Sequence, residues 1–130
     1  MTAPPLRKIL IIEDDFDIQT VARMALETVG GFTVAACGSG REAIEEAPRF
    51  KPDVILLDVM MPEMDGPTTL QHLRADVAVA ATPVIFCTAK AMPTELEHYQ
   101  ALGSAGVIAK PFDPMALAQQ VRDIWNRHHG

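Results

Sequence analysis

Short aliphatic runs alternate with longer amphipathic segments along the chain. The first run, residues 8–12, is aliphatic at every position after Lys8. The segment that follows, residues 15–29, is apolar at Ile18, Val21, Ala22, Ala25 and Val29. This is the spacing of one face of an α-helix, and the Gly30-Gly31 pair after it is typical of a helix end. The pattern therefore predicts a strand followed by an amphipathic helix.

The same alternation repeats four more times. Compact apolar runs predict further strands at residues 32–36, 53–57, 83–87 and 106–109. Helix-like segments follow them at residues 40–50, 66–75 and 94–102, and from Asp113-Pro114 to near the C-terminus. Residues 76–82, which are rich in alanine and valine, are expected to form a loop or a frayed helix end.

Sequence signals mark where three of these helices begin. Ser39 precedes Glu42 by three residues, and Thr94 precedes Glu97 by three, which is the spacing of a capping box. Asp113 is followed directly by a proline, a pair typical of an N-cap and a first helical turn. We therefore expect Ser39, Thr94 and Asp113 to cap helices.

Strand–helix repeats of this length predict a parallel sheet. Two parallel neighbours need a crossover of about a dozen residues or more, and each helical segment supplies one. The strands are near-continuous aliphatic runs, which is typical of strands that are covered on both faces. The 130 residues therefore predict one α/β domain, an open five-stranded parallel sheet with helices on both sides.

Composition narrows the functional classes. The net charge is −6, from 17 acidic and 11 basic residues, which argues against nucleic acid or an anionic membrane as the main partner. No apolar run approaches the roughly 20 residues of a membrane span, and the N-terminus lacks the apolar stretch of a signal peptide. Two cysteines, Cys37 and Cys87, indicate buried core thiols and not a disulfide framework. We expect a cytoplasmic protein with no membrane insertion.

Candidate chemistry lies at the carboxyl ends of the predicted strands, where ligands bind in sheets of this kind. The polar residues that follow the strands are Glu13, Asp14, Asp15, Asp58, Thr88 and Lys110. Three ionised aspartates in one cleft repel one another. A Mg²⁺ ion, which binds carboxylate oxygens, together with Lys110 would bring the local charge near zero and admit a phosphoryl group. Glu13 is expected to be a flanking acid and not a direct ligand.

Four sequence motifs carry these side chains. They are LIIEDD with Asp14-Asp15, VILLDVMMPEMDG with Asp58, VIFCTAK with Thr88 and IAKPF with Lys110. With these motifs the chain resembles the receiver domain of two-component response regulators, from Ile9 to the last helix. The resemblance implies a flavodoxin-like, doubly wound sheet with strand order 2-1-3-4-5. It also implies a single receiver domain over residues 1–130, with its core at about residues 7–127.

The resemblance implies a phosphoacceptor and a metal site. Asp58 would be the phosphoacceptor. Asp14, Asp15, Asp58 and the backbone carbonyl of Met60 would bind Mg²⁺, for which Mn²⁺ could substitute. On this basis the carboxylates that repel one another in the bare cleft become the ligands of one divalent cation.

The resemblance also implies how the phosphoryl group is held and exchanged. Lys110, in a cis peptide bond with Pro111, would pair with the phosphoryl oxygens, and Thr88 would hydrogen-bond the group after transfer. The donor would be a phosphohistidine on a sensor histidine kinase or a phosphotransfer protein. A downstream protein target would recognise the changed surface. No enzyme activity is expected beyond self-catalysed phosphoryl transfer and slow dephosphorylation.

Two positions bear on how a signal would leave the site. Val107 stands where receivers usually carry an aromatic residue that moves with the threonine, and Phe112 and Tyr99 do not replace it by position. We therefore expect output to depend on residues 88–92 and on the helix after them. Lys90, two residues past the threonine, is a hypothetical contact for the phosphoryl group or for an acid of a partner.

Other interpretations of the same residues stay open. Asp14 and Asp15 would also suit the start of the helix that follows them, since acids favour helix N-termini. A hydrolase of small phosphate esters would need an acid two residues after the nucleophile, where Met60 stands. A constitutive interaction module of receiver fold would have lost an acidic or lysine position, and none is lost. The chain could also be a receiver excised from a longer regulator.

Overall fold

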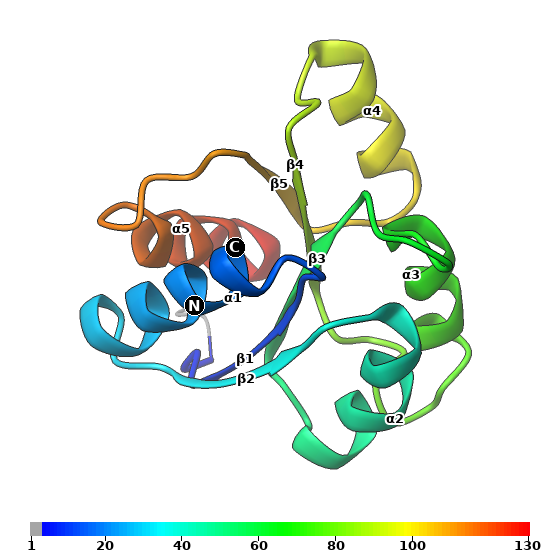
Figure 1. The fold of residues 1–130 in the computed structure, drawn as a ribbon, viewed down its shortest axis with the longest axis horizontal. Coiled ribbons are helices and arrows are strands. Elements are labelled where there is room, and N and C mark those ends of the chain that lie inside the picture. The colour runs from blue at the N-terminus through cyan, green and yellow to red at the C-terminus, as the bar shows by residue number, and fades with distance from the viewer. Residues whose placement is uncertain (1–3) are drawn as a thin grey trace.

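A single parallel sheet forms the centre of the molecule, and helices cover both of its faces (Figure 1). The computed structural model describes residues 4–130, so the first three residues of the expected domain lie outside the described residues. The strands are β1 (Lys8–Ile12), β2 (Thr33–Cys37), β3 (Val54–Asp58), β4 (Val84–Thr88) and β5 (Gly106–Ala109). Their order is β2-β1-β3-β4-β5, and every neighbouring pair is parallel. The predicted fold and strand order are confirmed.

The register of the sheet brings the carboxyl ends of its strands level with one another. Ile12 lies opposite Cys37 on one side and Leu57 on the other. On the far side of β3, Asp58 lies opposite Cys87, and Thr88 lies opposite the last residue of β5. The residues that follow these strands therefore start from the same edge.

Three strands lie one residue later than the apolar pattern predicts. β2, β3 and β4 were expected at residues 32–36, 53–57 and 83–87, but the ladder shifts each of them toward its C-terminus. The reason is that backbone pairing sets a strand's ends, whatever the polarity of the side chain. Asp58 and Thr88 are polar, yet both are paired in the sheet.

The helices divide between the two faces of the sheet. They are α1 (Phe16–Met24), the π-helical turn η1 (Ala25–Val29), α2 (Gly40–Phe50), α3 (Gly66–Arg74), α4 (Pro93–Ala101) and α5 (Leu117–His129). One core lies between the sheet and the face formed by α1, η1 and α5, and the other core lies under α2, α3 and α4 (Figure 1). Alternate residues of β1 enter opposite cores, Ile9 and Ile11 the first and Leu10 and Ile12 the second.

The first helix ends differently from the continuous helix that was predicted over residues 15–29. Its last turn is π-helical, and the Gly30 N–H donates to the Ala25 carbonyl at 3.3 Å. Phe32 then returns toward the helix, where its N–H donates to the Leu26 carbonyl. From α5, Arg122 donates to the Gly30 carbonyl at 2.6 Å. The bond from Gly30 to Ala25 spans five residues, so the last turn is wider than an α-helical turn. The other two bonds hold Gly30 and Phe32 where the chain enters β2.

One of the three predicted caps is confirmed. Ser39 caps α2, because its hydroxyl accepts a hydrogen bond from the Glu42 N–H at 3.1 Å. Glu42 in turn accepts from the Gly38 N–H. Thr94 does not cap α4, which begins at Pro93 after Met92 and has no side-chain cap. The reason is that Pro93 takes the first helical position, so the N-cap is Met92, two residues before Thr94. The Thr94 hydroxyl donates to its neighbour Glu95 instead.

The last helix also starts later than predicted. Asp113 accepts a hydrogen bond from the Met115 N–H at 2.9 Å, so it closes a separate turn over residues 114–116. α5 begins only at Leu117. The cysteines behave as expected, since Cys37 and Cys87 are both buried and free. Residues 76–82 form turns, as expected of a loop.

None of the helices in the described part of the chain, residues 4–130, combines the length and the apolar character that a membrane crossing needs.

Candidate functional site

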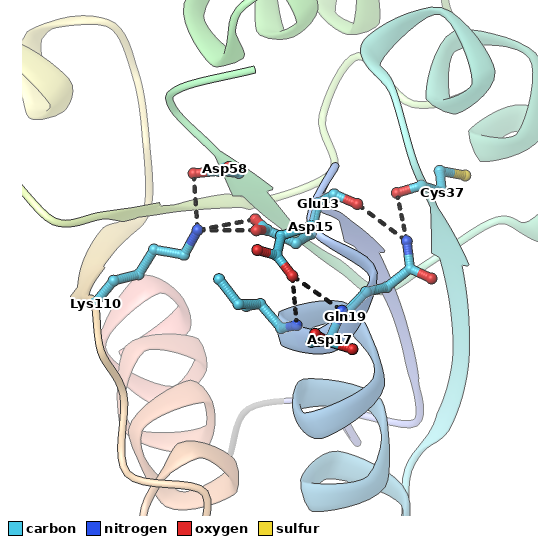
Figure 2. A network of polar contacts seen from close by, with 8 residues as sticks. Glu13, Asp15, Asp17, Gln19, Cys37, Asp58 and Lys110 are labelled. Carbon is cyan, nitrogen blue, oxygen red and sulfur yellow. Dashed lines mark hydrogen bonds and ion pairs between the residues drawn. The ribbon is translucent and has the colours of Figure 1, made fainter. Parts of the chain in front are cut away.

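Buried polar side chains gather at the carboxyl edge of the sheet. Glu13 follows β1, Asp58 ends β3 and Thr88 ends β4, and each is at most 5% exposed. Lys110 follows β5 and approaches them from the opposite side (Figure 2). Residues at the ends of four strands therefore lie at one edge of the sheet, as the positions of the motifs along the chain predict.

A lysine ammonium group lies between two buried carboxylates. Lys110 Nζ is 3.1 Å from Glu13 Oε1 and 2.9 Å from Glu13 Oε2, so both glutamate oxygens accept from it. The same nitrogen lies 3.2 Å from Asp58 Oδ1 (Figure 2). One positive charge is thus shared by two negative ones.

The third carboxylate of the cluster belongs to Asp14. One oxygen of Glu13, of Asp14 and of Asp58 can be chosen so that all three lie within 4.8 Å of one another. Asp14 is exposed, while the other two are buried. The cluster therefore has three carboxylates and one lysine, and it opens to solvent on the side of Asp14.

Burial and charge alter how this cluster binds protons. Burial, together with the hydrogen bond and the negative charge of Asp58, raises the pKa of Glu13 from 4.5 to about 7, although Lys110 opposes the rise. Burial alone would lower the pKa of Lys110, but its hydrogen bonds and its attraction to both acids raise it above the ordinary value. The lysine is therefore a permanent cation, and the excess negative charge on the acids has no full counter-charge from the protein.

Asp15 lies outside this cluster, in contrast to the expectation from the sequence. Its Oδ1 accepts hydrogen bonds from the Asp17 N–H at 2.9 Å and the Ile18 N–H at 3.1 Å, so it is the N-cap of α1. The unpaired N–H groups of the first helical turn attract this carboxylate. Of the two aspartates, the structure brings only Asp14 together with Asp58.

Glu13 takes the place in the cluster where Asp15 was expected. From the sequence, Glu13 was expected to be a flanking acid. A signal for the cap was present in the sequence, because an aspartate directly before an amphipathic stripe is a common N-cap. That reading leaves Glu13 and Asp14 as the acids that follow β1.

The loop after β3 is held close to Asp58 by a glycine. The Gly66 N–H donates to the Val59 carbonyl at 2.9 Å. A Cβ atom at Gly66 would lie 2.6 Å from the Asp58 carbonyl oxygen, which no side chain could tolerate without movement. Met60, whose carbonyl was expected to bind metal, lies in this loop and is 65% exposed. The glycine therefore lets the loop carrying Met60 turn back tightly beside the acid.

Thr88 and the residues after it form the other wall of the site. The Thr88 hydroxyl is buried and accepts a hydrogen bond from the Lys90 N–H at 3.0 Å, while Lys90 itself is exposed. Val107 of β5 is half-buried and packs against the core under α4. In that core, the buried ring of Tyr99 lies 5.3 Å from the ring of Phe86.

Two further features of the site bear on its chemistry. The Lys110–Pro111 peptide bond is cis, as the family resemblance implied. Burial raises the pKa of both thiols, Cys37 and Cys87, to about 12. The cysteines therefore stay protonated near neutral pH and do not serve as nucleophiles.

The donor set of the cluster suits a hard divalent cation. Mg²⁺ prefers carboxylate and carbonyl oxygens and keeps several waters, so a half-open cluster of acids fits it better than a closed cage. Asp14 and Asp58 could bind such an ion, because Glu13 is already paired with Lys110 through both oxygens. The residues present therefore fit a magnesium site.

Comparison with known proteins identifies what the chain is similar to. The family model of the response regulator receiver domain matches residues 9–122. The response regulator Rre1 of Synechocystis sp. is 32% identical over 120 residues, which are 92% of this chain and 52% of that protein. The alkaline phosphatase synthesis transcriptional regulatory protein PhoP of Bacillus subtilis is 33% identical over 121 residues, 93% of this chain and 49% of that protein.

A solved structure agrees with these matches. The chemotaxis response regulator CheY4 of Vibrio cholerae superposes with a TM-score of 0.84 at 28% identity, over 92% of this chain and 99% of that one. The chain spans about half the length of the curated relatives it matches.

Proposed function

This chain belongs to the response regulator receiver domain family, and from that premise we propose that it is a phosphorylation-controlled switch with Asp58 as the phosphoacceptor. The observation that carries the proposal is the shared lysine: Lys110 lies 3.2 Å from Asp58 Oδ1 and is bonded to Glu13, with Asp14 open to solvent nearby. This arrangement has room for a cation on one side of Asp58 and keeps an ammonium group on the other.

The proposed reaction transfers a phosphoryl group from a phosphohistidine. A carboxylate oxygen of Asp58 forms a bond to phosphorus while the phosphorus–nitrogen bond breaks. The electron pair of that bond returns to the imidazole, which takes a proton from solvent. Lys110 stabilises the charge that spreads over the phosphoryl oxygens, so catalysis rests on positioning and electrostatics.

Metal would be needed because the cluster is too acidic for a dianionic guest. When bound, Mg²⁺ or Mn²⁺ would offset the charge of the carboxylates and of the phosphoryl oxygens. We propose Asp14 and Asp58, with the Met60 carbonyl, as the groups that hold it. Asp15 would act instead through its cap on α1.

Phosphorylation would change the contacts of two residues. The new group adds about −1.5 to −2 charges beside Glu13 and competes with it for Lys110. The Thr88 hydroxyl, which now accepts from the Lys90 N–H, still has a proton to donate to a phosphoryl oxygen. Movement of Thr88 would then pull on the loop that leads to α4, and α4 would change the surface offered to a protein target.

The proposed partners are proteins. The donor would be a sensor histidine kinase or a phosphotransfer protein in the cytoplasm, and the target a downstream protein. The net charge of −6 gives no support to direct nucleic acid binding by this chain. Relatives include the DNA-binding response regulator MtrA of Mycobacterium leprae, of which this chain matches 50%. We propose that residues 1–130 form one receiver domain, either on its own or within a longer regulator.

Mass spectrometry after incubation with Mg²⁺ and acetyl phosphate tests the function. The wild-type chain should gain one phosphate-sized increment, which chelation of the metal abolishes. Asp58→Asn should gain none. Asp123→Asn is the matched control, because Asp123 is an exposed aspartate of α5 whose carboxylate accepts from Gln119, and it should react like wild type. No increment with acetyl phosphate or with a panel of phosphorylated kinases would instead favour a constitutive interaction module.

A further inference from the structure

A glutamine one turn into α1 reaches back to the loop that carries the acids. Gln19 Nε2 donates to the Glu13 carbonyl at 3.0 Å and to the Cys37 carbonyl at 3.1 Å (Figure 2). These carbonyls lie at the ends of β1 and β2. One side-chain amide therefore joins a helix to the carboxyl ends of two strands.

The backbone of Glu13 is held on both sides as a result. Its N–H donates to the Cys37 carbonyl at 3.0 Å, and its own carbonyl accepts from Gln19. Only three residues, 13–15, connect β1 to α1. Fixing the peptide groups of Glu13 therefore also fixes the direction in which Glu13 and Asp14 project.

We propose that Gln19 is a positioning residue that holds the Glu13–Asp14 loop in the geometry needed to bind a divalent cation; this rests on the proposed function. Such a restraint is needed because one carboxylate oxygen each of Glu13, Asp14 and Asp58 lies within 4.8 Å of the others, and like charges repel. Exposed Asp14 would relieve that repulsion by swinging outward if its loop were free. A clamp at the Glu13 carbonyl opposes this movement.

The chemistry of glutamine suits the task. An amide has two N–H donors and no net charge, so Gln19 binds two carbonyls without pairing with the acids. A lysine or arginine at this position would instead compete with a metal for the carboxylates. Groups that orient ligands without touching the metal commonly change metal affinity by about 10–100-fold when they are removed.

A pair of glutamine variants separates positioning from general stability. Gln19→Met keeps the length of the side chain and removes both donors. Gln119→Met is the matched control, because the Gln119 amide donates at 2.9 Å to Asp123 on the exposed face of α5. For each variant, calorimetric titration of the metal-free chain gives the Mg²⁺ dissociation constant, and urea unfolding gives the stability.

The expected result is a selective loss of metal affinity. Gln19→Met should raise the Mg²⁺ dissociation constant about tenfold, while Gln119→Met leaves it within twofold of wild type. Gln19→Asn provides a second variant in case the first fails to fold. It keeps the amide but is one methylene shorter, so it should reach one carbonyl at most and give an intermediate constant.

Other outcomes overturn the proposal. If Gln19→Met is less stable yet binds Mg²⁺ as wild type does, Gln19 is a purely structural residue. If the wild-type chain shows no Mg²⁺ binding, the positioning role fails as well. A wild-type chain that binds Mg²⁺ but accepts no phosphate would refute the proposed function alone, and the dissociation constants would still decide the role of Gln19.

Discussion

The β1–α1 connection and the β4–α4 connection both border the acidic cluster, but they are held very differently. In the first, Lys110 binds Glu13, Asp15 caps α1 and Gln19 clamps two strand ends. In the second, the Thr88 hydroxyl accepts one hydrogen bond from a backbone N–H, and α4 begins at Pro93 with no side-chain cap from Met92. Glu13 and Asp14 thus lie on a loop that several side-chain contacts hold, which is called the braced loop below. Thr88 leads into a loop with fewer such contacts.

α4 continues this contrast along its length. Tyr99 is its one buried residue, and Met92 and Leu96 are 64% and 38% exposed. In Figure 1 the connection and α4 extend beyond the end of the sheet. Elements with few buried contacts open at low free-energy cost. One side of the cluster is therefore preorganised for binding, and the other side is suited to move.

The largest effect is expected where α4 depends on a single anchor. Tyr99→Ala removes the ring that packs on Phe86 and should lower the free energy of unfolding by about 3 kcal/mol, as for other buried aromatic residues. Urea unfolding measures the loss, and hydrogen exchange should show it concentrated in α4. Leu96→Ala, on the same helix but partly exposed, should cost much less. Faster exchange in α1 as well would contradict the contrast between the two connections.

Glu13, on the loop after β1, should make the stability of the fold depend on pH. Because the pKa of Glu13 rises from 4.5 to about 7 on folding, the metal-free folded chain binds this proton more tightly than the unfolded chain. The stability that Glu13 contributes is therefore complete below about pH 4.5 and is lost as the pH rises through about 7.

Glu13→Gln should remove this loss. Relative to wild type, the variant should gain up to about 3 kcal/mol between pH 4.5 and pH 8, because each unit of a pKa rise from 4.5 to about 7 corresponds to about 1.4 kcal/mol. Urea unfolding across that range, without divalent metal, is the measurement. Glu97→Gln, an exposed glutamate of α4, should run parallel to wild type. Parallel curves for Glu13→Gln would show that folding leaves the pKa of Glu13 unchanged.

Asp15 offers a smaller and sharper test of the braced loop. Asp15→Ala removes the cap of α1 and should cost about 1 kcal/mol, whereas Asp15→Ser keeps an accepting oxygen and should cost a few tenths. Calorimetric titration should find Mg²⁺ binding nearly unchanged in Asp15→Ser and strongly weakened in Asp14→Ser. Equal weakening in the two serine variants would return Asp15 to the ligand set.

The smallest expected effect is a gain in stability at the start of α4. Met92→Ser places a serine three residues before Glu95, which completes a capping box at the start of α4. The variant should gain about 0.5–1 kcal/mol in thermal or urea unfolding. Met115→Ser, which replaces a comparably exposed methionine in the turn before α5, should stay within about 0.5 kcal/mol. No gain from Met92→Ser would mean that the missing side-chain cap of α4 does not lower the stability of the fold.

Local signals in the sequence were sufficient for the fold and for most of the site. Aliphatic runs at strand spacing and amphipathic segments between them predicted five strand–helix pairs and a parallel sheet, which the structure confirms. The strand order, which the family resemblance implied, is confirmed as well. Asp58 and Thr88 end β3 and β4, and Lys110 follows β5, so the parallel topology brings them to one edge. The burial of both cysteines followed from their apolar neighbours.

The details that the sequence analysis missed depend on hydrogen bonds between distant or competing groups. Polarity marked the ends of β3 and β4, but the ladder includes Asp58 and Thr88 because their backbones pair across the sheet. Thr94 matched a capping motif, yet Pro93 took the first helical position. Motif spacing treats each candidate alone and does not show which one the backbone selects.

The acidic cluster shows the same division most clearly. The strand pattern, a local property, was enough to show that three consecutive acids, Glu13 to Asp15, follow β1 and that Asp58 lies at the end of a later strand. The separate tasks of the three acids depend on tertiary contacts. Lys110, 97 residues along the chain from Glu13, binds that glutamate, and the N–H groups of α1 take Asp15. The Gln19 clamp, which joins two strand ends, also arises only when β1 and β2 are paired, since its two acceptors lie far apart in the unfolded chain.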